Sequence, residues 1–158
     1  IDSFSLIKNK DIKLVILGEG PSRKNLQKKI NKLGLKNEIL LLGLKNNPLI
    51  FLKNTDVFAL SSYSEGFPNS MLEAGICGIP TVAFDVKGGI HDIMLDGVNG
   101  FIVADGDIES YSKALRKAIN FPFNKNEIKK HILDKFDINI IISDYEALLL
   151  KLHNNKRI

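Results

Sequence analysis

The sequence predicts an α/β protein with a Rossmann-like, doubly wound parallel sheet that is flanked by helices. Short apolar runs rich in β-branched residues alternate with longer amphipathic stretches, which is the order that βαβ crossovers produce. The strand candidates are almost continuously apolar, as expected for strands covered on both faces. With 158 residues, 44% of them hydrophobic and 25% charged, the chain is long enough for one domain with its own core.

Strands are expected where such apolar runs are bounded by glycine, proline or charged residues. Ligands of doubly wound sheets bind at the carboxyl ends of the strands, so the loops that follow these runs are the places to look for a site. The predicted strands cover residues 12–17, 39–42, 56–60, 80–84 and 101–103.

Helices are expected before, between and after these strands. Ser22, Asn69 and Asp107 are side chains that commonly cap a helix, and Pro68 fits a first turn. We treat residues 1–158 as a single domain with a helical C-terminal extension over about residues 121–158. The predicted helices cover residues 1–10, 22–33, 48–53, 69–77, 90–94, 107–120, 125–134 and 139–153.

The stretch from residue 61 to residue 84 carries the strongest functional signal. Between Gly66 and Phe84 the only charged residue is Glu73, on a predicted helix that is apolar nearly all round and is therefore expected to be buried. A carboxylate there is costly unless it is paired. Glu65 precedes the helix, so we expect two carboxylates to converge on a helix N-terminus whose free N–H groups suit an anion.

This pattern resembles the Glu-x7-Glu signature of the family 4 retaining glycosyltransferases, the group 1 transferases with the GT-B fold. Here it reads Glu65-Gly-Phe-Pro-Asn-Ser-Met-Leu-Glu73, and Gly88-Gly89-Ile-His-Asp92 continues the resemblance, with Asp92 where the family has Glu. The match covers about residues 1–119. It implies that the chain is the C-terminal, nucleotide-sugar-binding half of a GT-B enzyme, with the N-terminal acceptor domain of the same protein missing from it.

The resemblance also assigns roles to residues. Glu73 resembles the carboxylate that accepts hydrogen bonds from both ribose hydroxyls, and Glu65 resembles the catalytic-site acid beside the donor sugar. From the residues alone, Glu73 could instead be a buried acid satisfied by local backbone and Glu65 a surface charge. The backbone assignments implied are Gly66, Phe67 and Asn69 to sugar hydroxyls, Ser70 and Met71 to the phosphates, Gly18 and Gly20 to the border of the nucleotide pocket, and Gly43 and Leu44 to the base.

The implied activity is transfer of a hexose, with retention, from a nucleotide-diphosphate sugar to a saccharide or lipid-linked acceptor in surface polysaccharide synthesis. UDP-hexose or UDP-N-acetylhexosamine is the favoured donor. The resemblance implies a metal-independent reaction without a cofactor, and no cluster of residues has metal-ligand spacing. The family's diphosphate-neutralising Arg and Lys lie upstream of these residues, so the chain alone is expected to be inactive.

Two other classes of protein are compatible with an α/β fold. A nucleotide-binding or receiver-like regulatory module would need an acidic pair at a strand end, where this chain has only Gly18-Glu19. A glycoside hydrolase would use Glu65 and Glu73 as its two carboxylates. A position near a helix N-terminus lowers the pKa of an acid, which disfavours a hydrolase's general acid at Glu73.

The net charge of +4 arises partly from one basic stretch. Such a stretch could bind anionic lipid or nucleic acid, but a solvated helix face with Leu26, Ile30 and Leu33 turned inward is the favoured interpretation. Nucleic acid is disfavoured because the stretch has no aromatic side chain for base stacking. Its basic residues are Arg23, Lys24, Lys28, Lys29, Lys32 and Lys36.

Cellular location is inferred from what the sequence contains. No apolar run approaches the length of a membrane span, and the first residues lack the order of a signal peptide. Cys77 is the only cysteine, which excludes an internal disulfide and is typical of a reducing compartment, with a packed thiol expected on an apolar helix. These features predict a cytoplasmic protein, with peripheral association at the inner membrane face as an option.

Overall fold

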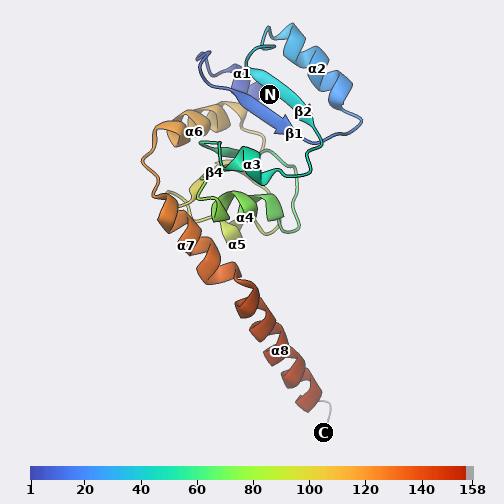
Figure 1. Ribbon diagram of the computed structural model, residues 1–158, viewed down its shortest axis with the longest axis vertical. Helices are drawn as coiled ribbons and strands as arrows, with labels where there is room; N and C mark the ends of the chain where they lie inside the picture. Colours follow the sequence, from blue (N-terminus) through green and yellow to red (C-terminus); the bar gives the residue numbers. More distant parts are fainter. Residues whose placement is uncertain (156–158) are drawn as a thin grey trace.

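The strands of the computed structural model, which describes residues 1–155, are all parallel to their neighbours (Figure 1). β1 (Leu14–Leu17) pairs with β2 (Ile39–Gly43), and β4 (Thr81–Asp85) lies between β3 (Phe58–Leu60) and β5 (Gly100–Ala104). The expected parallel α/β architecture is therefore confirmed. The expected single sheet is not, because within the described residues the ladders form separate sheets of two and three strands. β3 is only three residues long and pairs with β4.

One face of the strands is covered by the helices α1 (Asp2–Ser5), α2 (Arg23–Lys32) and α6 (Ile108–Asn120). Their buried side chains join the two sheets through one apolar cluster, which spans β2, β4 and β5. The cluster includes Phe4, Ile7, Ile30, Ile39, Val82, Phe101, Val103, Tyr111, Leu115 and Ala118.

Tyr111 is the polar member of this cluster. Its hydroxyl lies 3.1 Å from the Leu60 carbonyl oxygen and 2.7 Å from that of Val82, and it donates toward both. Its ring centroid is 4.5 Å from that of Phe84. Burial removes water from the phenol and raises the pKa of Tyr111 above its ordinary value. Tyr111 thereby ties α6 to β4 and to the end of β3, where the loop toward Glu65 begins.

The opposite face is covered by four helices, α3 (Leu49–Leu52), α4 (Asn69–Ile76), α5 (Ile90–Ile93) and α7 (Lys125–Phe136). α7 packs directly against α4, where a Cβ built on Gly75 would lie 2.5 Å from Ile132 Cγ1. The absence of a side chain at Gly75 therefore allows the two helices to approach closely. Met71, Ala83, Val86, Ile90, Ile93, Met94 and Ile132 make up the larger cluster on this face.

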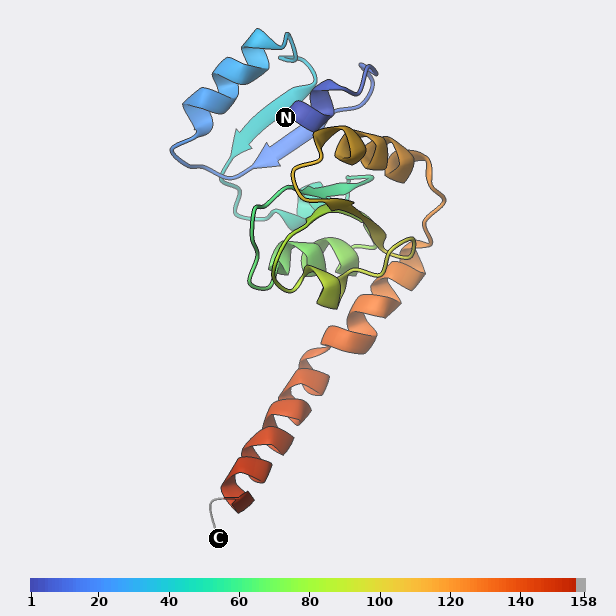
Figure 2. The ribbon, with the colours of Figure 1, turned by 180° about the vertical axis from the view of Figure 1, so that it is seen from behind.

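The last described helix, α8 (Ile138–Asn155), projects away from the rest of the molecule (Figures 1 and 2). The sequence assigned residues 121–158 to a helical extension, but α7 belongs to the packed domain through Ile128 and Ile132, which are at most 1% exposed. Only α8 extends from it. No helix within residues 1–155 is long and apolar enough to cross a membrane.

Several local predictions need correction. The helix expected over residues 1–10 is only α1, because residues 8–11, after Ile7, are all polar and offer no apolar periodicity. Ser22 occupies the N-cap position of α2 but makes no side-chain capping bond. Asp107 does cap α6, accepting a hydrogen bond from the Ser110 N–H at 2.9 Å. That bond lowers the pKa of the Asp107 carboxyl.

The expectation that both faces of every strand are covered also fails at one place. Val15 and Leu40 are paired across β1 and β2, and they are 41% and 42% exposed. Leu33, expected to face inward from α2, is 42% exposed at the helix C-cap, whereas Ile30 is fully buried as predicted. Within residues 1–155, α2 packs against β2, and Val15 and Leu40 remain open to solvent.

Candidate functional site

Four loops with site-like residues leave the carboxyl ends of β1 to β4. The third of them, between β3 and α4, contains Glu65, and Glu73 lies one turn into α4. Glu73 is exposed, which contradicts the prediction that it is buried. The reason is that α4 buries a narrow stripe of Met71, Ala74 and Gly75, so the other side of the helix remains open.

The Glu73 carboxylate is available to a ligand. Among residues 1–155 it has neither an ion-pair partner nor a side-chain hydrogen bond. The alternative that local backbone satisfies this acid is therefore not supported. Ile76, one turn further along α4, is also 51% exposed, so a partly apolar surface continues from Glu73 along the helix.

The beginning of α4 offers backbone donors beside this carboxylate. The N–H groups of Gly66, Phe67, Asn69 and Ser70 have no acceptor within the described chain. Met71 does not share this property, because its N–H donates to the Pro68 carbonyl at 2.9 Å. Its assignment to the phosphates stays a prediction. Asn69 is the first helical residue and not the cap that the sequence predicted, since Pro68 holds the N-cap position without a side-chain bond.

Glu65 is half-buried and held by its own loop. Its Oε1 accepts a hydrogen bond of 2.5 Å from the Ser62 hydroxyl. Its N–H donates to the Lys87 carbonyl at 3.2 Å, and the Gly89 N–H donates to the Gly66 carbonyl at 2.8 Å. These two backbone bonds join the loop after β3 to the loop after β4.

Gly88 makes this contact between loops possible. Its φ is +127°, and a Cβ at this position would overlap the Glu65 carbonyl oxygen. A side chain is excluded both by the backbone conformation and by the neighbouring loop. The family resemblance identified this Gly-Gly pair, but the single sequence did not reveal its contact with residues 65 and 66.

The charged residues that follow β4 lie at the surface. His91 is exposed and its Nε2 lies 2.7 Å from Asp85 Oδ1. Asp92 is exposed as well, and its carbonyl oxygen accepts a 2.6 Å hydrogen bond from Lys135 Nζ. The position where the family has Glu is thus tied to α7 through its backbone. Lys87 is exposed, and its side chain has no ion-pair partner in the described part of the chain.

The first and second loops are brought together at the ends of β1 and β2. The Gly18 N–H donates to the Gly43 carbonyl at 2.9 Å. Gly43 has a φ of +72°, a backbone conformation that favours glycine, and a Cβ there would lie 2.5 Å from Glu19 Oε1, at the end of a flexible side chain. Leu44 follows with 76% of its surface exposed.

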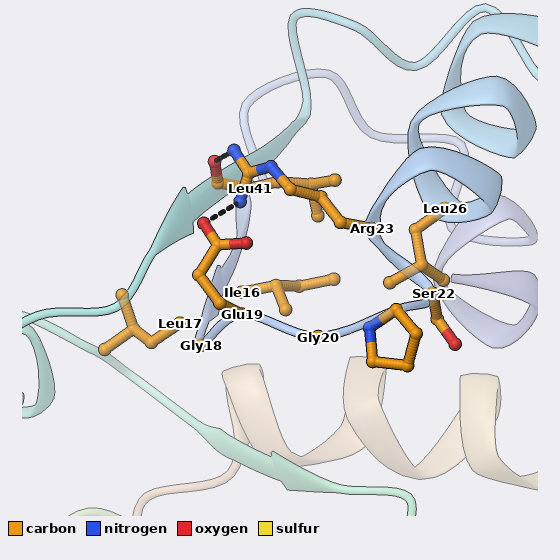
Figure 3. A pocket seen from close by; sticks show the side chains of 10 residues that line it. Ile16, Leu17, Gly18, Glu19, Gly20, Ser22, Arg23, Leu26 and Leu41 are labelled. Carbon is orange, nitrogen blue, oxygen red and sulfur yellow. Dashed lines mark hydrogen bonds and ion pairs between the residues drawn. The ribbon is translucent and has the colours of Figure 1, made fainter.

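A pocket of about 230 Å3 opens beside the first loop (Figure 3). At its rim, Arg23 Nη1 lies 2.7 Å from Glu19 Oε1, and Arg23 Nη2 donates to the Leu41 carbonyl at 2.9 Å. The sequence did not identify this ion pair, although the i, i+4 spacing of the two residues was a signal for it. The pocket is lined by Ile16, Leu17, Gly18, Glu19, Gly20, Pro21, Ser22, Arg23, Leu26 and Leu41.

The predicted site residues therefore do not all line one hollow. Gly18 and Gly20 line the pocket, whereas Gly43, Leu44 and the segment from Glu65 to Glu73 do not. Within residues 1–155, no three His, Cys, Asp or Glu side chains are grouped so that they could hold a metal ion. That the reaction needs no metal stays a prediction.

Comparison with known proteins identifies the family of the chain. The family model for glycosyl transferases group 1 matches residues 1–135. The chain belongs to the group 1 glycosyltransferase family. An uncharacterised glycosyltransferase of Methanocaldococcus jannaschii is 41% identical over 101 residues, which are 63% of this chain and 25% of that protein.

A further relative and a solved structure match nearly the whole chain. The capsular polysaccharide biosynthesis glycosyltransferase CapM of Staphylococcus aureus is 28% identical over 155 residues, 94% of this chain and 40% of CapM. The crystal structure of HepE of Anabaena in complex with UDP superposes with a TM-score of 0.82 at 22% identity, covering 95% of this chain and 43% of HepE. This likeness shows the GT-B-type fold. The chain spans less than half the length of these relatives.

Proposed function

We propose that this chain is the donor-binding domain of a retaining hexosyltransferase that uses a UDP-sugar and acts in the synthesis of a surface polysaccharide or lipid-linked saccharide. Membership of the group 1 family supports the transferase class. The UDP in the structure of HepE and the capsular role of CapM support the donor base and the pathway class. UDP-hexose or UDP-N-acetylhexosamine is the donor we favour.

The observation that carries this proposal is the open carboxylate of Glu73 beside unpaired backbone donors at the start of α4. An ionised acid accepts hydrogen bonds and donates none, so it suits the two vicinal hydroxyls of a ribose. The free N–H groups of Asn69 and Ser70 provide donors for an anion at the helix N-terminus. A nucleotide diphosphate has both groups, a diol and an anion.

Glu65 is assigned to the donor sugar. The Ser62 hydroxyl and the two bonds to the loop after β4 hold it in one place, as a residue close to a reacting centre requires. Gly66 and Phe67 lie beside it with unpaired N–H groups that suit sugar hydroxyls. The whole enzyme would transfer the sugar with retention, and the nucleotide diphosphate would leave.

The other assignments complete the proposal. Gly18 and Gly20 border the nucleotide, and the backbone at Gly43 and Leu44 contacts the base. We propose that the reaction is metal-independent and that the chain alone is inactive, because the acceptor domain and the upstream cations belong to other parts of the protein. The proposed location is the cytoplasm.

Isothermal titration with UDP, GDP and ADP tests the donor class and the role of Glu73 together. We expect UDP to bind best, and we expect the Glu73→Ala variant to bind it about ten- to a hundredfold more weakly, as for loss of a charged hydrogen-bond acceptor. Glu109→Ala is the matched control, because Glu109 is also an exposed glutamate near the start of a helix. Equal affinity of both variants for UDP would refute the assignment, and measurable sugar transfer by the chain alone would refute its inactivity.

A further inference from the structure

α2 presents a row of lysines that the donor site does not use. Lys24, Lys28 and Lys32 recur every four residues along it, Lys36 follows the helix, and all four side chains are exposed. Residues at i and i+4 are neighbours on a helix surface, so the three helical lysines share one side. Figure 2 shows α2, in light blue, at the outer end of the molecule, far from α8.

Two acids near α2, Glu19 and Asp2, are paired with its other cations. Arg23 Nη1 lies 2.7 Å from Glu19, and Lys29 Nζ lies 2.5 Å from Asp2. Within the part of the chain that the structure describes, none of the other four lysines has a carboxylate partner. Like charges at i and i+4 destabilise a helix, so this row is unfavourable by itself and an external anion would relieve it.

The basic charge is also segregated along the molecule. Residues 61–107, which include the loops after β3 and β4, contain seven acidic residues and one basic residue. The overall charge of +4 therefore understates how positive the α2 end is. A negatively charged surface would therefore be attracted to this end of the molecule.

We propose that α2 docks the domain onto an anionic lipid bilayer through Lys24, Lys28, Lys32 and Lys36. Clusters of lysine on a helix bind anionic headgroups, and each lysine contributes by charge attraction at the surface. The side chains between them include Asn25, Gln27 and Asn31, so polar headgroups are the main contact. This proposal does not depend on the identity of the donor.

Vesicle sedimentation tests it. The chain is expected to sediment with vesicles rich in phosphatidylglycerol and to be released at about 0.5 M salt, where charges are screened. The quadruple variant K24Q/K28Q/K32Q/K36Q is expected to bind at least about tenfold more weakly, since one lysine near an anionic surface contributes about fivefold. UDP affinity of this variant should not change.

The matched control removes the same charge elsewhere. K113Q/K129Q/K130Q/K151Q also replaces four exposed lysines without a carboxylate partner in the described residues, and it leaves α2 intact. Equal loss of binding in both variants would show a general effect of net charge and overturn the proposal. Equal binding to neutral phosphatidylcholine vesicles would overturn it too, as would retention by soluble polyanions or nucleic acid with no retention by vesicles.

Discussion

The contact between the loops after β3 and β4 predicts a large effect of Gly88→Ala. An L residue at φ +127° costs about 1–2 kcal/mol. The new methyl group would overlap the Glu65 carbonyl and force the loops apart. The Glu65 to Lys87 and Gly89 to Gly66 hydrogen bonds would then break, at about 0.5–1.5 kcal/mol each. The expected loss in the free energy of unfolding is therefore about 2–5 kcal/mol.

Gly106→Ala is the matched control for this prediction. Gly106 also has a positive φ, +74°, but a Cβ there has nothing within 4 Å. It should lose only the backbone term of about 1–2 kcal/mol. Urea denaturation followed by circular dichroism measures both variants. In titrations, Gly88→Ala should weaken the binding of UDP-glucose more than the binding of UDP, because Glu65 is assigned to the sugar. If Gly88→Ala is no more destabilising than Gly106→Ala, the loop contact is not what the structure indicates.

Three further predictions concern stability. Gly75→Ala should lower the free energy of unfolding by about 1–2 kcal/mol, since crowding against Ile132 outweighs the gain in helix propensity. The loss should be smaller in an Ile132→Ala background. Equal losses in both backgrounds would exclude the contact. Tyr111→Phe should lower the free energy of unfolding by about 1–2 kcal/mol, measured in urea. Because the pKa of Tyr111 is raised in the folded state, the wild type should lose stability as pH rises above about 10, and the variant should lose less. The pKa of Asp107 is lowered in the folded state, so this carboxylate stabilises the fold above its unfolded pKa, and the stabilisation is lost as pH falls through the folded pKa. Asp107→Asn should therefore make the free energy of unfolding less dependent on pH over this acidic range. An unchanged pH profile would contradict the cap.

The sequence predicted the positions of the strands and of the loops after them well, because each apolar run ends at a residue with a physical reason to end it. Gly18 and Gly43 both have positive φ, and both stand where a strand passes into a loop. Glu65 and Glu73 were identified by their spacing and context. Their location in a loop and on the following helix needs only local information.

Burial was predicted less well, because it depends on what packs against an element. The helix with Glu73 looked apolar all round, but α7 covers only its small-residue side at Gly75, which leaves Glu73 and Ile76 exposed. The approach of Gly88 to Glu65 joins two loops more than 20 residues apart, and nothing in a single sequence reveals such a pair. The division of the strands into two sheets likewise depends on long-range pairing.

The central claim is that the Glu73 carboxylate holds the ribose of a UDP-sugar. Titration of wild type and Glu73→Gln with UDP and with 2′-deoxy-UDP tests it most directly. Wild type should bind UDP about tenfold or more better than the deoxy analogue, as for loss of a hydrogen bond to a charged group, and Glu73→Gln should discriminate much less. The same preference for UDP in both proteins would mean that another group reads the 2′-hydroxyl.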